Sequence, residues 1–139
     1  MIHDISVQKL VQFIKRRERK FTNVSIEDFN FTLRDYDLED VEFENCFVNF
    51  NLENCNLKNA RFNFCNLKTI SIQNCSMKNC SMKNCSMKNC YIFSCHIESI
   101  TITGRGMDQI VFGTNYAYGI TLNPDQSALY VKSGILKNR

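Results

Sequence analysis

Residues 74–90 read NCSMKNCSMKNCSMKNC, a five-residue unit that follows itself three times with a cysteine at each step. The same period extends on both sides of this stretch. From Phe50 to Ile102, each residue whose number ends in 0 or 5 is apolar, and so is the residue two positions later. The remaining positions are mostly Asn, Ser and Lys. Because this period fits neither an α-helix nor a long strand, the sequence predicts a repeat architecture.

The spacing within the unit indicates how the chain folds. Two inward residues that flank one outward residue form a short extended segment, and two further polar residues turn a corner. Successive coils built in this way pair as parallel strands about 4.8 Å apart. Their inward side chains fill one continuous column. The period therefore predicts an all-β solenoid, although it leaves the number of sides open.

Three consecutive units carry a resemblance to a known family: CNLKN at 55–59, ARFNF at 60–64 and CNLKT at 65–69. They are similar to the unit of pentapeptide-repeat proteins, a small residue, a polar residue, Leu or Phe, and two polar residues. The resemblance implies a right-handed quadrilateral β-helix with about twenty residues in each coil. We expect a single domain over residues 1–139, with an N-terminal capping helix in 1–23, the β-solenoid in 24–122, and a C-terminal capping helix and tail in 123–139.

The frame has two irregularities. Upstream, the apolar pairs keep the period but lie one residue out of step, because only Asn49 separates Val48 from Phe50. One corner should be shortened there. Downstream, Arg105 and Asn115 interrupt the frame, so residues 105–122 are expected to form a degenerate last coil. The upstream pairs are Phe31/Leu33, Tyr36/Leu38, Val41/Phe43 and Cys46/Val48.

The cysteines occupy the small inward position of the unit, where a compact apolar side chain is needed. Vertical stacks join cysteines about twenty residues apart. A zinc site needs four converging ligands, which the different walls of a filled column do not supply. We therefore predict a structural role and expect neither a metal nor another cofactor. The predicted core residues are Cys55, Cys65, Cys75, Cys80, Cys85, Cys90, Cys95, Leu57, Phe62, Leu67, Met77, Met82 and Met87.

Both ends of a solenoid need covers, since they expose strand edges and the open core. Apolar residues at helical spacing predict a covering helix within residues 5–20; they are Val7, Leu10, Val11 and Ile14. A second helix is predicted from Asn123-Pro124 to about Ser133. The tail DQSALYVKSGIL is similar to the closing helix of quinolone-resistance-type pentapeptide proteins, which dimerise through that end. The resemblance implies a homodimer with contacts from Tyr130, Val131, Ile135 and Leu136.

Charge and composition restrict the functional classes. The chain has a formal net charge of +3 and eight cysteines. Lysines encircle the middle coils instead of forming a stripe, so nucleic-acid binding is not expected. The amino terminus lacks the order of a signal peptide, and no apolar run is long enough to span a bilayer. These features predict a cytoplasmic protein with reduced thiols and no membrane contact.

Catalytic constellations are missing from the sequence. His96 falls at an outward position, His3 lies in a terminal segment expected to be loosely held, and the carboxylates cluster on a convex surface. We therefore expect a non-enzyme that acts as a protein-binding or scaffold module for a partner of unknown identity. The alternative, implied by the resemblance, is a DNA mimic that protects a topoisomerase (DNA gyrase). Such mimicry needs dense negative charge over a long surface, whereas acids dominate only the first coil.

Overall fold

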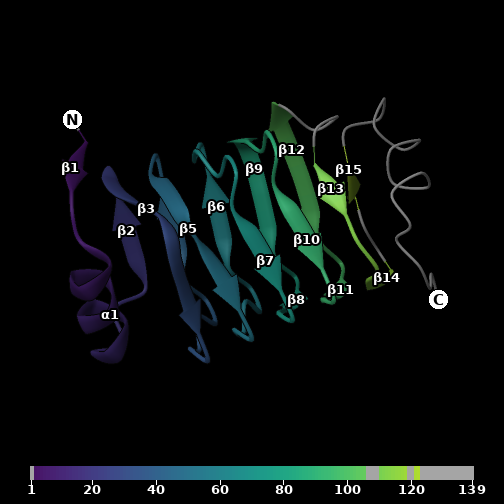
Figure 1. Cartoon of the computed structure of the whole chain (residues 1–139), viewed down its shortest axis with the longest axis horizontal. Helices are drawn as coiled ribbons and strands as arrows, with labels where there is room; N and C mark the ends of the chain where they lie inside the picture. The colour runs from purple at the N-terminus through teal and green to yellow at the C-terminus, as the bar shows by residue number, and fades with distance from the viewer. Residues whose placement is uncertain (1, 106–109, 119–120, 123–139) are drawn as a thin grey trace.

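A computed structural model describes residues 2–105, 110–118 and 121–122 of the chain. The strands stack along one axis from the N-terminal to the C-terminal end, and all of their pairings are parallel (Figure 1). One core cluster runs through the stack from Val7 to Ala117. The described residues thus form the all-β solenoid that the five-residue period predicted.

Three sheets form three sides of the column. The first contains, in spatial order, β1 (His3–Asp4), β3 (Val24–Arg34), β5 (Phe47–Glu53), β7 (Ser71–Gln73), β10 (Tyr91–Phe93) and β13 (Val111–Phe112). The second contains β8 (Ser76–Lys78), β11 (His96–Glu98) and β14 (Tyr116–Tyr118). The third contains β2 (Lys20–Thr22), β4 (Glu42–Glu44), β6 (Arg61–Asn63), β9 (Ser81–Ser86), β12 (Thr101–Arg105) and β15 (Thr121–Leu122).

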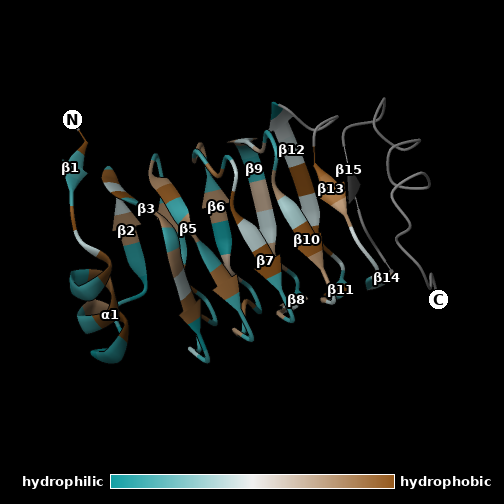
Figure 2. Ribbon diagram, in the orientation of Figure 1, coloured by the Kyte–Doolittle hydropathy of each residue, from teal (hydrophilic) through white to brown (hydrophobic). Residues whose placement is uncertain are grey.

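A fourth side, called the fourth face below, is held by single bridges that join Phe47 to Asn66 and Asn66 to Ser86. The beginnings of β3 and β5 and the end of β9 also lie on it, because these strands continue around a corner. The column is therefore four-sided, as the resemblance to pentapeptide-repeat proteins implied. Apolar and polar residues alternate along the strands, and most corners are polar (Figure 2).

The register locates the shortened corner at Asn49. Phe43 pairs with Phe62, nineteen residues later, whereas Phe62 pairs with Met82, twenty residues later. Asn49 itself is buried, and its Nδ2 atom donates to the Lys68 carbonyl at 3.3 Å. The sequence frame thus predicted the position of the missing residue, and the structure adds that an amide fills the tightened corner.

The corners explain the asparagines of the repeat. Most corner residues adopt a positive φ, which asparagine tolerates better than other side chains that carry a Cβ atom. Eight of these corners carry Asn, namely Asn23, Asn45, Asn54, Asn59, Asn74, Asn79, Asn84 and Asn89. Corner side chains also connect coils, since Asn45 Nδ2 donates to Asn23 Oδ1 at 2.7 Å and Asn54 Nδ2 to Asp35 Oδ1 at 2.7 Å. In the unit SMKNC, the asparagine therefore turns the chain.

The N-terminal cover is shorter than expected. Helix α1 spans Val7–Lys15, begins at the capping residue Ser6, and packs on the first coil (Figure 1). The chain turns at Arg17, which has a φ of 67°, and Lys20 already begins strand β2. The solenoid therefore starts before residue 24, because the Phe21 ring stacks on Phe43 with centroids 5.1 Å apart. His3, expected in a loosely held terminus, lies in β1 and pairs with Val24. The second predicted helix, within 123–139, falls outside the described residues.

The last coil departs from the predicted frame in a specific way. A register shift between Ile102 and Gly104 places Arg105 beside Ser86 on the surface. Asn115 then returns to an inward position and is buried. The two residues that interrupt the pattern thus differ in position: Arg105 faces outward, and Asn115 faces the interior of the column.

Candidate interaction surface

The thirteen residues predicted to form the core are all buried, each with at most 3% of its surface exposed. Cysteines stack vertically across coils, and Cys46 joins the stack of Cys65 and Cys85 because the shortened corner shifts its register by one residue. None of these side chains is available to a partner, so an interaction site has to lie on the outside of the column.

Most of the buried thiols form hydrogen bonds to backbone carbonyls of the preceding coil. Cys85 Sγ donates to the Phe62 carbonyl at 3.1 Å, and Cys90 Sγ to the Leu67 carbonyl at 2.6 Å. Burial raises the pKa of the Cys80 thiol to about 12. All eight cysteines are free, and among the described residues no group of three or more His, Cys, Asp or Glu side chains is placed to hold a metal ion.

Three acids of the first coils are paired with arginines. Arg34 Nε lies 2.6 Å from Glu53 Oε1, and Arg61 Nη2 lies 3.2 Å from Glu42 Oε1. Arg17 Nη1 lies 3.6 Å from Asp37 Oδ2. The basic residues that follow α1 therefore pack beside acids of the neighbouring coil, and this pairing reduces the net negative charge of the surface.

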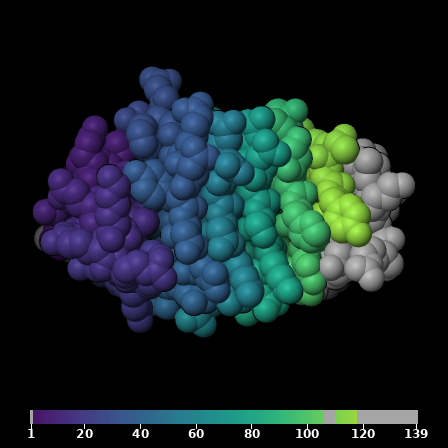
Figure 3. All heavy atoms as spheres, turned by 90° about the horizontal axis from the view of Figure 1, so that it is seen from below, coloured from purple at the N-terminus to yellow at the C-terminus, as the bar shows by residue number. Residues whose placement is uncertain are grey.

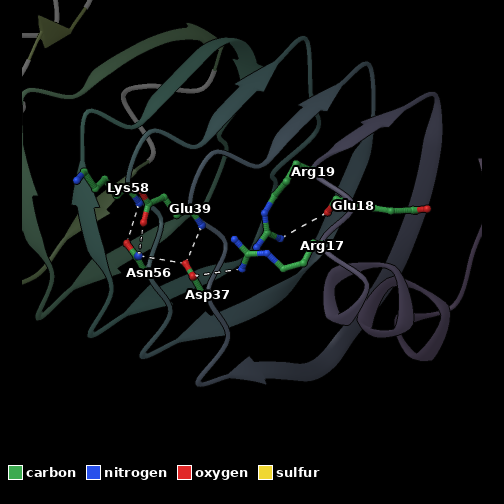
Figure 4. A network of polar contacts seen from close by, with 7 residues as sticks. All are labelled: Arg17, Glu18, Arg19, Asp37, Glu39, Asn56 and Lys58. Carbon is green, nitrogen blue, oxygen red and sulfur yellow. Dashed lines mark hydrogen bonds and ion pairs between the residues drawn. The ribbon is translucent and has the colours of Figure 1, made fainter.

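Asp37 is the centre of the polar network in Figure 4. Its Oδ1 atom accepts the backbone N–H of Glu39 at 3.0 Å and the Asn56 amide at 3.1 Å. The Glu39 N–H is the main cause that holds the pKa of Asp37 below its ordinary value, and the cations of Arg17 and Arg19 act in the same direction. The carboxylate is thus kept ionised and occupied, which suits a structural connection between α1 and the solenoid better than acid–base chemistry.

Three lysines of the middle coils have no counter-charge within the described residues, whereas Lys78 Nζ lies 4.0 Å from Glu98 Oε1. Lys68 and Lys88 stand on successive coils at the far edge of the fourth face, and Lys83 lies at the adjoining corner. All three are exposed, and none forms an ion pair with a described residue. The fourth face is therefore flanked by uncompensated positive charge.

A groove crosses the fourth face along the axis of the column. It has a volume of about 710 Å³ and takes residues from four successive coils. Its floor contains Cys46, Cys65 and Cys85, and its walls contain Asn45, Phe47, Phe64, Asn66, Asn84, Ser86, Thr103, Gly104 and Arg105. We call it the phenylalanine groove. None of its lining residues is acidic.

Phe64 is an unusual residue for its position. It has a φ of 55°, at a corner where the neighbouring coils carry Asn45 and Asn84. A bulky side chain in this conformation costs roughly 1–2 kcal/mol. The ring is nevertheless 63% exposed, and Phe47, across the groove, is 37% exposed. Packing within the column therefore does not explain why a phenylalanine stands at residue 64. The five-residue spacing by itself identifies Phe64 only as an apolar residue at an outward position.

Two further exposed features lie away from the groove. Phe29 is exposed in the excursion that interrupts the pairing of β3 between Glu27 and Thr32, and a protrusion of the surface is seen near these residues (Figure 3). On the far coils, the His96 ring lies 5.0 Å from the Tyr116 ring, and its Nε2 atom lies 3.4 Å from Glu98. The predicted dimer contacts Tyr130, Val131, Ile135 and Leu136 fall outside the described residues.

Over the described residues, no helix has the length and apolar character needed to cross a membrane.

The model of the family described as pentapeptide repeats matches residues 33–71, in 8 copies. The coils outside this segment keep the same register, as the pairing of Ser81 with Thr101 shows. Residues 33–71 therefore carry pentapeptide repeats, and the described coils on either side continue the same β-solenoid.

A comparison with curated proteins finds no match. Solved structures of QnrB1, described as a plasmid-mediated fluoroquinolone resistance protein, are similar at low identity. One trypsin-treated variant is 16% identical, over 86% of this chain and 94% of that chain, with a TM-score of 0.40. A second is 15% identical, over 85% and 90%, with a TM-score of 0.31. The full-length protein is 13% identical, over 94% and 93%, with a TM-score of 0.22. At such values these similarities support no conclusion about what the present chain binds.

Proposed function

We propose that this chain is a non-catalytic protein-binding module whose solenoid acts as a rigid frame for a recognition surface. The single observation that carries the proposal is the phenylalanine groove, where Phe47 and Phe64 expose aromatic surface and Phe64 does so without a structural need for it. Aromatic side chains in a concave setting are typical anchors of protein interfaces. The paired coils around them supply a fixed geometry, which lowers the cost of ordering on binding.

The charge distribution favours protein binding over the DNA-mimic alternative. A mimic of duplex DNA needs about one negative charge per 1.7 Å of axis. Here Glu42, Glu53 and Asp37 are paired with arginines, and the following coils carry lysines. Topoisomerase protection is therefore the less favoured alternative for the surface of the described coils.

Quantitative affinity capture tests the proposal. The immobilised chain is incubated with lysate of its native source, and bound proteins are compared by mass spectrometry with those on a Phe47→Ser/Phe64→Asn double variant. A protein enriched on the wild type and depleted on the variant is the expected result. Enrichment of no protein on the wild type would overturn the protein-binding proposal.

A homodimer formed through Tyr130, Val131, Ile135 and Leu136 is part of the proposal. Its support is the apolar character of the tail, since a compact apolar patch is commonly covered by two-fold association. Sedimentation of the wild type beside Leu136→Asp tests it. A dimer that the substitution converts into a monomer is expected, and a monomeric wild type would eliminate the dimer.

A further inference from the structure

We infer that the phenylalanine groove binds an extended acidic segment of the partner protein, with one aromatic or large aliphatic side chain seated between Phe47 and Phe64. The inference rests on the proposed function and specifies the chemistry of the partner. It follows from the aromatic walls, the surrounding charge, and the length and polar lining of the groove.

The two phenylalanines in the walls of the groove indicate which side chain of the partner would be seated there. Phe64 sits at a corner where asparagine is the ordinary choice, and its ring points into a groove instead of the core. A residue that departs from its local preference without a packing gain is a candidate functional residue. With Phe47 on the opposite wall, the groove presents two ring surfaces to an inserted side chain. An aromatic anchor would gain both apolar burial and ring contacts.

The charges around the groove indicate which residues should flank the seated side chain in the partner segment. Arg105 lines one end, Lys83 flanks the corner beside the groove, and Lys68 and Lys88 follow its other edge. None of these four cations is ion-paired within the described part of the chain. Since the lining contains no carboxylate, a partner with acids on both sides of its anchor is complementary in charge.

The dimensions and lining fit a peptide. The groove crosses four coils, so its length is about 14 Å at the spacing of paired strands, enough for about four extended residues. Its walls offer amides and hydroxyls, from Asn45, Asn66, Asn84, Ser86 and Thr103. Asn66 Oδ1 already accepts the Lys68 N–H at 3.0 Å, which orients the Asn66 amide and leaves its Nδ2 group as a donor for a peptide carbonyl.

A single strand of nucleic acid fits this groove less well. Its phosphates carry negative charge at every step, and Glu44 stands immediately before Asn45, where the groove ends. A peptide can place its acids beside Lys68, Lys83 and Lys88 and leave the Glu44 end uncharged. The peptide is therefore the better complement.

The test uses a fluorescein-labelled probe of sequence Asp-Glu-Phe-Asp-Glu and measures anisotropy at low and high salt. We expect saturable binding that weakens as salt is raised, because the charged contacts are screened. Two control probes replace the central Phe by Ser, or the acids by Lys, and both should bind at least about tenfold more weakly. If the acidic probe does not bind, or binds no better than the controls, the inference is wrong.

Matched variants assign the binding to the groove. Phe64→Asn should fold, since asparagine holds the same corner in the adjacent coils, and should weaken binding at least about tenfold. Lys68→Glu/Lys88→Glu should also weaken it, whereas Thr69→Asn, a corner change outside the groove, and Lys58→Glu, on another face, should stay within about twofold of wild type. Equal affinities for all variants would overturn the inference. So would a single-stranded oligonucleotide that binds more tightly than the acidic probe and loses affinity in the same variants.

The outcomes of the affinity capture and of the peptide-binding experiment distinguish the proposed function from the groove inference. If affinity capture recovers a protein that Phe64→Asn retains as well as the wild type, the chain binds proteins through another surface and only the groove inference fails. If the acidic probe binds in the groove but capture recovers no protein, the chemistry of the groove stands and the proposed function fails.

Discussion

Asn115 accepts the backbone N–H of Cys95 through Oδ1 at 2.9 Å, so an amide side chain occupies the inward position one coil beyond a cysteine. Its Nδ2 atom donates to the carbonyls of Ile92 at 3.1 Å and Gly113 at 3.0 Å. A buried amide is tolerated there because all of its hydrogen-bonding groups have partners. Asn115 therefore ends the cysteine stack by connecting two coils through their backbones.

The first prediction follows from these three hydrogen bonds. Asn115→Ala should lower the free energy of unfolding by about 2–4 kcal/mol, because the Cys95 N–H loses its partner, the carbonyls of Ile92 and Gly113 each lose one donor, and a small cavity is left. Urea unfolding followed by circular dichroism measures the change. The exposed neighbour substitution Thr114→Ala is the control and should cost less than about 0.5 kcal/mol. Equal midpoints for the two variants would contradict the role given to Asn115.

The second prediction concerns the corner at Thr69, where a β-branched residue has a φ of 67°. Thr69→Asn should stabilise the protein by up to about 1 kcal/mol, since asparagine occupies the left-handed region at lower cost. The reciprocal change at the corner one coil further, Asn89→Thr, should destabilise it by a similar amount. Thermal melts of the two variants should therefore move in opposite directions, and a shift of both in the same direction would refute this reading of the corners.

The third prediction concerns Gly104, which has a φ of 140° and lies against the backbone of the preceding coil. A Cβ atom added there would meet the Cys85 carbonyl oxygen, so Gly104→Ala requires the backbone to move. We expect a loss of more than about 2 kcal/mol, measured by urea unfolding. Ser86→Ala, in the same part of the fourth face, should be tolerated. A Gly104→Ala protein as stable as Ser86→Ala would show that the close approach is relaxed in solution.

Much of the fold was predictable because the inward positions obey one simple rule. The five-residue period located the core, and the missing residue at Asn49 located the register change, since both depend only on which residues face inward. The groove was not predictable in the same way. Its existence depends on the register shift at Gly104 and on the outward direction of Phe64 at a left-handed corner, and both are backbone features that hydrophobic spacing does not encode. The spacing shows that Arg105 interrupts the frame, but for the same reason it does not show that the side chain turns outward.

The fourth prediction uses the pKa of the Cys80 thiol, which burial raises from its ordinary value of 9.0 to about 12. Below pH 9 the thiol is protonated in both the folded and the unfolded chain. Between pH 9 and pH 12 the unfolded chain releases the proton and the folded chain keeps it, so stability falls as pH rises, by up to about 1.4 kcal/mol per pH unit.

Comparison with Cys80→Ala isolates this effect from the titration of the lysines. At pH 7 the alanine variant should be less stable than wild type by about 1 kcal/mol, because it leaves a small cavity. By about pH 10 the order should be reversed, since the variant has no thiol to ionise at this position. Cys80→Asp, which buries a carboxylate without a partner, should be far less stable than Cys80→Ala at neutral pH. A stability difference between wild type and Cys80→Ala that is constant from pH 7 to pH 10 would contradict the raised pKa.

The fifth prediction concerns the cover formed by α1. Leu10 is buried on the side of the helix that faces the first coil, together with Val7 and Ile14. Leu10→Asp should detach the helix, because a buried carboxylate without a partner costs several kcal/mol, more than the packing of a short helix provides. The freed end then exposes the ring of Phe21 and the edge of the first coil, and both favour association between copies. Light scattering should show aggregation of Leu10→Asp, whereas Gln8→Asp, an exposed change on the same helix, should remain monodisperse. If Leu10→Asp keeps the wild-type melting temperature and size, the end of the column does not need α1, and the helix is free to serve another role.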